Sequence, residues 1–370
     1  MTGAEFDVIV VGGGPAGSAC ATVLAGRGHS VAVLERARFP REKICGDTLN
    51  PRSWELLETL GVSGELRRSQ LVAVSALRVF NSRGQCARSR ILPQASRSLT
   101  AVRRSLFDTV LLRHASRMGA QVFEETTAVE VEPGRWVRLK ARHPGGSWTG
   151  SCRYLVGADG RNSTVARALL PRQDESGDGR IGLQWYTAAQ ERLTDEIHLY
   201  LLPFGYFGIV SIGPEAANLA MVLDTRRTST GVRDIAGLLQ LMRHSNSAID
   251  RTLRDLTPLS PVQTTSPITP RPARRGRENV VLIGDAGRIV EPFTGEGIYF
   301  ALRDGVTTGE ELSARLGGGS APSKQSSSGL LVNRVVSPLL RRPSLADRAV
   351  SLGAALPLLT RAATRLVARL

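Results

Sequence analysis

The sequence predicts an α/β protein built on a Rossmann-type parallel sheet, with a second domain inserted into it and helices at the C-terminal end. Three observations support this fold class. An apolar run at residues 6–11 leads into a glycine-rich loop, and a second run at residues 279–285 ends on an aspartate. Between them, residues 173–272 include segments in which apolar and polar residues alternate, as in strands. Because 370 residues exceed the usual size of one hydrophobic core, we expect two interleaved domains.

The N-terminal run and its loop have the pattern of a nucleotide-binding turn. The apolar run FDVIVV at residues 6–11 is typical of a strand that is buried on both faces. Gly12 then fits a tight turn, Gly14 lets the backbone approach a pyrophosphate, and Gly17 allows the next helix to pack closely on the strand. The spacing of the three glycines therefore predicts a phosphate-binding loop.

A helix, a strand and an acid complete this unit. Pro15 and Ala16 open the helix, whose N-terminal N–H groups face the diphosphate. Gly28 ends the helix, and the strand VAVL leads to Glu35, a carboxylate that can accept hydrogen bonds from both ribose hydroxyls. The complete unit predicts a dinucleotide site, but by itself it leaves NAD and FAD open.

Composition and charge exclude several other classes. Net charge is +15 and the sequence pI is about 10.9, but the arginines are scattered and form no basic helix interleaved with aromatic residues, so we expect no nucleic-acid partner. The four cysteines, at widely spaced positions, argue against a metal site and a disulfide framework and fit a reducing cytoplasm: Cys20, Cys45, Cys86 and Cys152. With no signal-peptide pattern and no long uncharged apolar run, we expect a soluble, cytoplasmic protein.

Three further segments identify the cofactor by resemblance. They read RARFPREKICGD at residues 36–47, YLVGADGRNSTVAR at 154–167 and NVVLIGDAGRIVEPFTGEGIYFAL at 279–302. In this order they resemble the flavin-dependent hydroxylase superfamily of para-hydroxybenzoate hydroxylase. Within it, the chain is most similar to the geranylgeranyl reductase branch and to related natural-product flavin monooxygenases. The resemblance extends from residue 5 to about residue 312.

The resemblance implies a division into domains. An FAD-binding domain of the glutathione reductase type comprises residues 1–72, 101–172 and 273–316, and a mixed sheet formed by residues 73–100 and 173–272 covers the flavin and holds the substrate. A flexible linker at 317–329 and helices at 330–370 follow. FAD is expected to bind tightly without a covalent bond. NAD(P)H binds transiently, because no separate nicotinamide domain is visible, and O2 is a co-substrate if the protein is a monooxygenase.

The same three segments supply most of the expected cofactor contacts. Asp285 ends an apolar strand, where its carboxylate can accept hydrogen bonds from the ribityl chain. Arg104 matches a family arginine that reaches the FAD phosphates, or is a solvated helix residue. We expect the following residues to bind FAD: Gly12, Gly14, Pro15, Ala16, Gly17, Glu35, Arg36, Arg41, Lys43, Cys45, Gly46, Arg104, Val129, Asp159, Gly160, Gly284, Asp285, Pro292, Gly295, Gly297 and Ile298.

Three residues are candidates for catalysis: Cys45, Pro292 and Tyr206. Cys45 is either a redox thiol or a small packing residue. Tyr206 either stacks on an apolar or aromatic substrate or packs in the core. It lies in PFGYFGIVSIG, where the aromatic Phe-Pro signature of geranylgeranyl reductases is absent.

Three functions remain open at this point. The first is NAD(P)H- and O2-dependent hydroxylation of an apolar phenol or polyketide through a flavin C4a-hydroperoxide. The second is reduction of prenyl double bonds, and the third is a non-catalytic FAD scaffold, with halogenase chemistry also considered. The C-terminal helices either cap the fold or contact a membrane surface peripherally, and both monomer and dimer are open.

Overall fold

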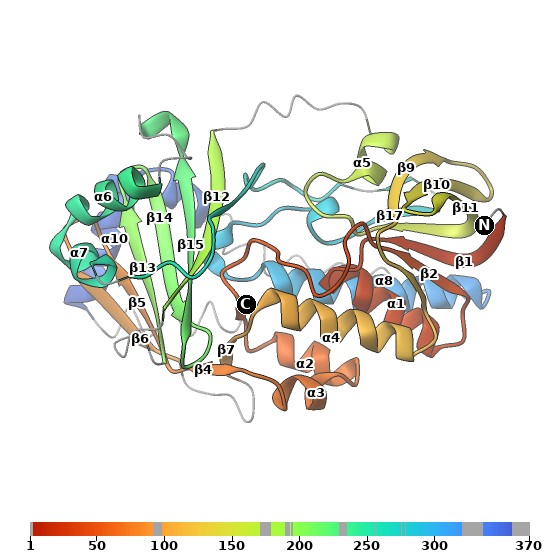
Figure 1. Ribbon diagram of the computed structural model, residues 1–370, viewed down its shortest axis with the longest axis horizontal. Coiled ribbons are helices and arrows are strands. Elements are labelled where there is room, and N and C mark those ends of the chain that lie inside the picture. Colours follow the sequence, from red (N-terminus) through yellow and green to blue (C-terminus); the bar gives the residue numbers. More distant parts are fainter. Residues whose placement is uncertain are drawn as a thin grey trace.

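Two large sheets, joined by a small one, form the protein (Figure 1). The computed structural model describes residues 3–91, 98–170, 179–188, 193, 195–228, 235–254, 256–274, 276–277, 279–319 and 336–356. The predicted α/β class is confirmed, with one helix-covered, largely parallel sheet and one largely antiparallel sheet.

The first large sheet carries the glycine loop and is called the cofactor sheet here. Its strands run in the order β8-β2-β1-β11-β10-β9, and β17 pairs with the end of β11. The pairs β8–β2, β2–β1, β1–β11 and β11–β17 are parallel, whereas β9, β10 and β11 are antiparallel. The bounds are β1 (Ala4–Val11), β2 (Val31–Leu34), β8 (Gln121–Phe123), β9 (Thr127–Glu132), β10 (Val137–His143), β11 (Gly146–Gly157) and β17 (Val280–Leu282).

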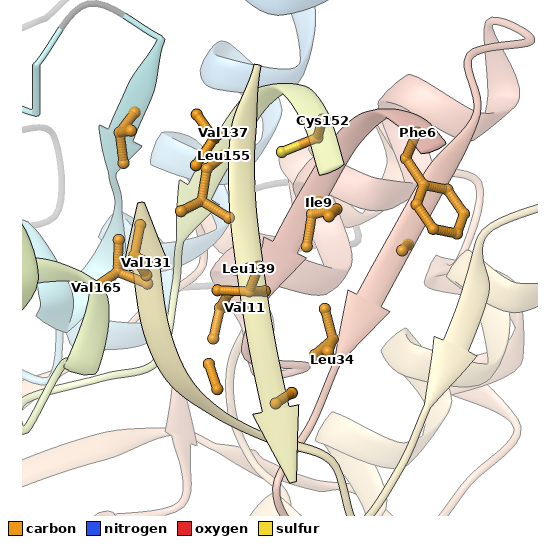
Figure 2. Packing of buried hydrophobic residues seen from close by; sticks show 14 of the residues in the cluster. Phe6, Ile9, Val11, Leu34, Val131, Val137, Leu139, Cys152, Leu155 and Val165 are labelled. Atoms are coloured by element: carbon orange, nitrogen blue, oxygen red, sulfur yellow. The ribbon is translucent and has the colours of Figure 1, made fainter. Parts of the chain in front are cut away.

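Both faces of the cofactor sheet are covered, as the apolar run of β1 predicts. Ile9 and Val11 belong to a cluster with strands β9–β11 and helix α5 (Thr164–Leu169), which Figure 2 shows. Val8 and Val10 belong to the cluster on the other face, which includes residues of α1 (Pro15–Gly26), α4 (Arg104–Arg117) and α8 (Gly297–Leu316). The carboxyl ends of β1, β11 and β17 therefore meet at one edge.

The second large sheet, called the substrate sheet here, has the order β16-β12-β15-β14-β13-β5-β6. Only its β5–β13 pair is parallel. The bounds are β5 (Ala76–Phe80), β6 (Cys86–Arg90), β12 (Arg180–Ala188), β13 (Glu196–Leu202), β14 (Gly205–Ser211), β15 (Ala216–Asp224) and β16 (Gln263–Thr265). Helices α6 (Ile235–Ser245) and α7 (Ser247–Leu253) cover one face, and α10 (Pro343–Ala355) packs near β6 (Figure 1).

Short elements connect the two large sheets. Strands β3 (Thr48–Leu49), β7 (Leu99–Ala101) and β4 (Val72–Val74) form the small sheet, beside helices α2 (Ser53–Thr59) and α3 (Ser63–Arg67). The 3-10 turns are η2 (Thr225–Arg227), η3 (Gly284–Ala286) and η4 (Pro292–Thr294). Two predicted domain boundaries, 72/73 and 100/101, fall inside β4 and β7, so the small sheet crosses them. Most of the predicted linker, and residues 357–370, lie outside the described residues.

Candidate functional site

Three adjoining cavities run from the glycine loop to the substrate sheet. The distal cavity lies between the glycine loop and Glu35, the central cavity between the glycine loop and η4, and the apolar cavity under the substrate sheet. They enclose about 920, 1000 and 1070 Å³ of empty space, part of it open to solvent. Gly14 and Lys43 line both the distal and the central cavity, and Cys45 and Pro292 line both the central and the apolar cavity. The cavities can therefore hold one extended ligand with a second molecule at its inner end.

The glycine loop has the geometry that a diphosphate requires. A Cβ at Gly12, where φ is +105°, would collide with the carbonyl of Ala158, and one at Gly17 would collide with the carbonyl of Gly12. In contrast, a Cβ at Gly14 would meet only the Arg41 side chain, at 3.6 Å. Gly12 thus permits the tight turn, and Gly17 permits the close approach of helix α1 to the loop. Gly14 leaves open space over the N-terminus of α1.

Glu35 is fixed at the end of β2 by backbone hydrogen bonds. Its carboxylate accepts hydrogen bonds from the N–H groups of Gly13, at 2.8 Å, and Ala37, at 2.9 Å. The side chain is buried and lines the distal cavity with Arg36. A carboxylate can accept further hydrogen bonds, so Glu35 remains suited to the ribose hydroxyls for which the sequence predicts it.

Basic side chains dominate the central cavity. Lys43, Arg104 and Arg161 line it, and Arg41 lines the neighbouring distal cavity. Burial, together with the nearby arginines, lowers the pKa of Lys43 to about 8 against the opposing effect of Asp285. This concentration of positive charge suits a polyanion, because a bound diphosphate relieves the repulsion among the cations.

Arg104 opens helix α4 and is buried, not solvated. Its guanidinium forms a two-pronged ion pair with Asp108, with both N–O distances at 2.8 Å, and Arg41 lies 3.2 Å from the same carboxylate. The Arg104 side chain therefore has a fixed position at the wall of the central cavity, from which it also contacts Cys45.

At the opposite wall, the turn η3 presents Asp285. Arg161 donates a hydrogen bond to it at 3.0 Å. Burial opposes ionisation of Asp285, but the charges of Arg161 and Lys43 outweigh it and hold the pKa of Asp285 below its usual range. Asp285 thus remains an ionised hydrogen-bond acceptor. Nη1 of Arg161 is buried and has no hydrogen-bond partner among the described residues, so it is available to a ligand.

The turn η4 and the start of α8 approach the central cavity with backbone. Gly295 has φ of +67°, and a Cβ there would meet only Thr48, at 3.6 Å. A Cβ at Gly297, the first residue of α8, would meet only Val290, at 3.9 Å. These positions line the cavity together with Gly284, Pro292 and Ile298, at all of which the sequence predicts an FAD contact. A flat ring can therefore lie against the backbone, near the N–H groups of the helix terminus.

The substrate sheet holds the segment PREKICGD by polar side chains, which we call the sheet clamp: Gln184, Tyr186 and Asn218. The amide N–H of Cys45 donates to Gln184 at 3.1 Å, and Asn218 donates to the carbonyl of Cys45 at 2.8 Å. The hydroxyl of Tyr186 lies 3.1 Å from a carboxylate oxygen of Asp47. This loop borders the central and apolar cavities, which we call the two inner cavities. The substrate sheet thus fixes the loop in place.

Cys45 lies where the central and apolar cavities meet. Burial raises the pKa of its thiol, although the Arg104 guanidinium beside it acts in the opposite direction. The group is therefore a protonated thiol at neutral pH. No disulfide involves it. Its position leaves both a chemical role and a packing role possible, as the sequence does.

Tyr206 does line the apolar cavity, but its hydroxyl is committed elsewhere. It donates to Glu291 at 2.6 Å, and Arg180 forms a two-pronged ion pair with the same buried carboxylate. The ring meets Phe293 edge to face, with centroids 5.1 Å apart. Because Glu291 precedes Pro292, this buried network fixes the η4 turn to the substrate sheet.

The sheet side of the apolar cavity is mostly aliphatic, apart from Tyr206 and Thr265. It is lined by Leu77, Leu183, Ile197, Leu199, Ile209, Val210, Met221, Val222 and Ile268. Polar side chains gather toward the cofactor side, where Thr48 and Arg161 also line the central cavity. The cavity therefore has a polar inner end and an apolar body.

One predicted FAD contact, Val129, lies away from the cavities, and the carboxylate of a second, Asp159, is partly occupied by backbone N–H groups. The side chain of Val129 is exposed on β9 and does not line the cavities, whereas its neighbour Ala128 lines the distal cavity. Asp159 lines that cavity, but its carboxylate accepts hydrogen bonds from the N–H groups of Thr164 and Val165, so it caps α5. Gly160, with φ of +80°, lines the central cavity as expected.

The structure also adds residues that the sequence reasoning missed. Arg161 immediately follows the GADG turn, and this position in the sequence could have identified it. Asp108 follows Arg104 by one helical turn, which could have identified it as the partner of Arg104. No local pattern signals the sheet clamp or the pairing of Arg180 with Glu291. The residues present nevertheless fit FAD. The glycine loop leaves space for a diphosphate, Glu35 is positioned for a ribose, basic side chains line the central cavity, and the backbone of η4 and α8 leaves space for a flat ring.

Comparisons with known proteins agree with this fit. A family model described as an FAD binding domain matches residues 5–327. A menaquinone reductase of Mycobacterium tuberculosis is 29% identical over 84% of this chain and 77% of its own length. The flavin-dependent halogenase armH4 of Armillaria mellea is 27% identical over 84% of this chain, which spans only 65% of that protein. The solved complex of aklavinone-11 hydroxylase with FAD and aklavinone is 23% identical, covers 92% of this chain and 68% of its own, and has a TM-score of 0.71.

Proposed function

This chain belongs to the FAD-binding family whose model matches residues 5–327, and from that premise we propose that it is an NAD(P)H- and O2-dependent monooxygenase that hydroxylates an apolar phenol. FAD is its cofactor, and the family is one of FAD-dependent oxidoreductases. The observation that carries the proposal is the shape and polarity of the apolar cavity at the inner end of the flavin site.

The cavity suits a molecule with one polar group and a hydrocarbon body. Thr48 and Arg161, at the cofactor side, offer hydrogen-bond donors to a phenolic oxygen. The aliphatic side chains of the substrate sheet bury the remainder of the molecule and exclude water. This orientation places the ring carbons beside the hydroxyl near the flavin, where hydroxylation occurs.

Side chains of this chain position the reactants and are not required to react. When bound and reduced by NAD(P)H, FAD supplies the oxygen activation. One oxygen atom of O2 enters the phenol and the other leaves as water, with the two electrons coming from NAD(P)H. Asp285 and Glu35 would hold the cofactor's hydroxyl groups, and Pro292 and Cys45 line both the ring site and the apolar cavity, where the two meet.

The test couples oxygen uptake to product formation. Purified FAD-loaded protein is mixed with NADH or NADPH and a series of phenols with increasing alkyl substituents, and oxygen uptake and products are measured. We expect one hydroxylated product per O2 and per NAD(P)H. Ala220→Leu, which fills the apolar cavity, lowers kcat/KM for the bulkier phenols about tenfold or more, whereas Ala73→Leu, at an exposed position of β4, leaves it unchanged. Consumption of NAD(P)H in the presence of an accepted phenol but without oxygen uptake would contradict the proposal.

One observation favours a second candidate, reduction of a prenyl double bond. Such a reaction needs a hydride from the flavin and a proton from a nearby acid. Cys45 carries a protonated thiol at the boundary of the two inner cavities. The similarity to a geranylgeranyl diphosphate reductase of Rhodobacter capsulatus, 27% identical over 85% of this chain and 77% of its own length, supports the same candidate.

The two candidates differ in their need for oxygen and for this thiol. If the protein is a prenyl reductase, it hydrogenates a polyprenyl substrate under strictly anaerobic conditions. Cys45→Ser then lowers that rate at least about tenfold while flavin reduction by NAD(P)H continues. If it is a phenol hydroxylase, Cys45→Ser retains hydroxylation and no anaerobic product forms.

A further inference from the structure

Helix α10 is attached to the substrate sheet by one of its faces. Ala346 and Val350 are buried there, and Asp347 accepts a hydrogen bond from the backbone N–H of Ser82 at 2.9 Å. Ser351 is a hydrogen-bond partner of Asn81, at 3.0 Å. These contacts are made with the β5–β6 hairpin, beside which α10 lies (Figure 1). They fix the rotation of the helix about its axis and determine which face is turned outward.

The outward face carries a stripe of leucines. Leu345, Leu352 and Leu356 are 39%, 55% and 46% exposed. Leu345 and Leu352, seven residues apart, lie on one side of α10 at about 100° per residue, and Leu356 follows directly after the last helical residue, Ala355. They are three of the seven large hydrophobic side chains that are exposed in the described part of the chain, and the other four are dispersed elsewhere. Scattered exposed leucines are ordinary, whereas a stripe marks an interaction surface.

Basic side chains flank this stripe. Arg342 and Arg348 are exposed and lie three residues before and three residues after Leu345. The sole acid in the segment 336–356 is Asp347, which is turned inward toward Ser82. The outward face of α10 is therefore apolar and positive without a compensating negative charge of its own.

We propose that the outward face of α10 docks on an anionic membrane surface. Leucines between arginines match the boundary between acyl chains and negatively charged headgroups. A second copy of this chain is a poorer partner, because it carries the same net charge of +15. No helix in the described residues meets the length and hydropathy of a membrane span, so the contact is peripheral.

The position of α10 gives this contact a consequence for the apolar cavity. Ala346 and Val350 belong to the same packed cluster as Tyr206, Val222 and Ile268, which line that cavity. Docking therefore holds the outer wall of the apolar cavity close to the lipid, where apolar molecules concentrate. The docking itself does not depend on which reaction the flavin performs, and it is measured without turnover.

The test is co-sedimentation of the full FAD-loaded chain with vesicles. One set contains phosphatidylcholine alone, and a second set also contains phosphatidylglycerol. We expect binding to the anionic vesicles that weakens with salt. Leu352→Glu lowers the partition coefficient about tenfold or more, and replacing Arg342 and Arg348 by Gln lowers it about fivefold for each arginine. Leu259→Glu is the matched control, since Leu259 is 54% exposed but lies outside α10, and it binds as the unaltered protein does.

Three results would overturn the proposal. Equal binding of Leu352→Glu and the unaltered protein would place the membrane contact elsewhere in the chain. Equal binding to both vesicle types would show that the arginines do not select an anionic surface, and binding to neither would show that α10 does not dock on a membrane. A dimer in light scattering that Leu352→Glu converts to a monomer, without vesicle binding by either form, would assign the stripe to a second copy. Flavin absorbance and thermal unfolding of each variant establish that it is folded.

Discussion

Replacing Asp47 by asparagine tests how the buried charge of this residue, in the loop that borders the central and apolar cavities, affects the stability of the protein. The Asp47 side chain is fully buried, and its carboxylate lies 3.1 Å from the Tyr186 hydroxyl and 3.3 Å from the backbone N–H of Arg104. Burial raises the pKa of Asp47 from 3.8 to about 7, against the opposing effects of Tyr186 and Arg104. Its φ of +53° lies in the left-handed region, which asparagine adopts as readily as aspartate. The substitution therefore removes the charge while keeping the backbone and the hydrogen-bond acceptor.

The sign of the effect follows from proton binding. Because the folded state has the higher pKa, it binds more protons than the unfolded state between about pH 4 and pH 7. The contribution of Asp47 to stability therefore falls as the pH rises through this window and stays low above it. With one pKa unit equal to about 1.4 kcal/mol, the unaltered protein should lose about 2 kcal/mol relative to Asp47→Asn between about pH 5.5 and pH 8.

Urea unfolding of the apoprotein at several pH values, followed by tryptophan fluorescence, measures this difference. Comparing each variant with the unaltered protein cancels other groups that titrate in the same range, such as Glu296, whose pKa burial raises to about 7. Glu215→Gln, exposed in the turn between β14 and β15, is the matched control and should run parallel to the unaltered protein. If the curve for Asp47→Asn also runs parallel, Asp47 is ionised in the folded state at low cost and the reasoning is refuted.

Two further substitutions test the cofactor site. Gly17→Ala should abolish stable FAD binding, because the added Cβ overlaps the carbonyl of Gly12. Gly64→Ala is the control and should retain FAD, since its Cβ would meet only the end of a flexible side chain. FAD retention after gel filtration distinguishes the two variants, and retention by Gly17→Ala would contradict the loop geometry. Arg161→Met should raise the pKa of Asp285 and weaken FAD binding about tenfold, with a larger loss at acidic pH. A fluorescence titration of the variant with FAD at two pH values measures this loss. If the FAD affinity of the variant does not change with pH, Arg161 does not control the ionisation of Asp285.

The sequence predicts the parts of the site that are local in the chain. The strand at residues 6–11, the glycine loop and Glu35 form one continuous unit, and each residue's role follows from its distance to the next. Asp285 could be predicted for the same reason, since it follows directly on an apolar strand. Asp159 shows the limit of this reasoning: it follows a strand too, but nearby N–H groups of α5 bind its carboxylate.

The contacts that the sequence does not predict join distant segments. Gln184 and Tyr186 contact residues 139 positions earlier in the chain, and Arg180 contacts Glu291 across 111 positions. Gln184, Tyr186 and Arg180 all belong to β12. Which strand lies opposite which loop depends on the packing of the two sheets, and no single segment encodes it.

These distant contacts place the flavin under control of the substrate sheet from two sides. Tyr186 reaches the loop that carries Cys45, and Tyr206 with Arg180 reaches Glu291, directly before Pro292. Both loops border the central cavity, and both networks are buried, where an unpaired polar group is costly. A displacement of the sheet by a bound substrate must therefore move both loops or break buried hydrogen bonds. The substrate sheet thus supports the flavin site and also forms a wall of the apolar cavity, so substitutions beneath it should alter flavin binding.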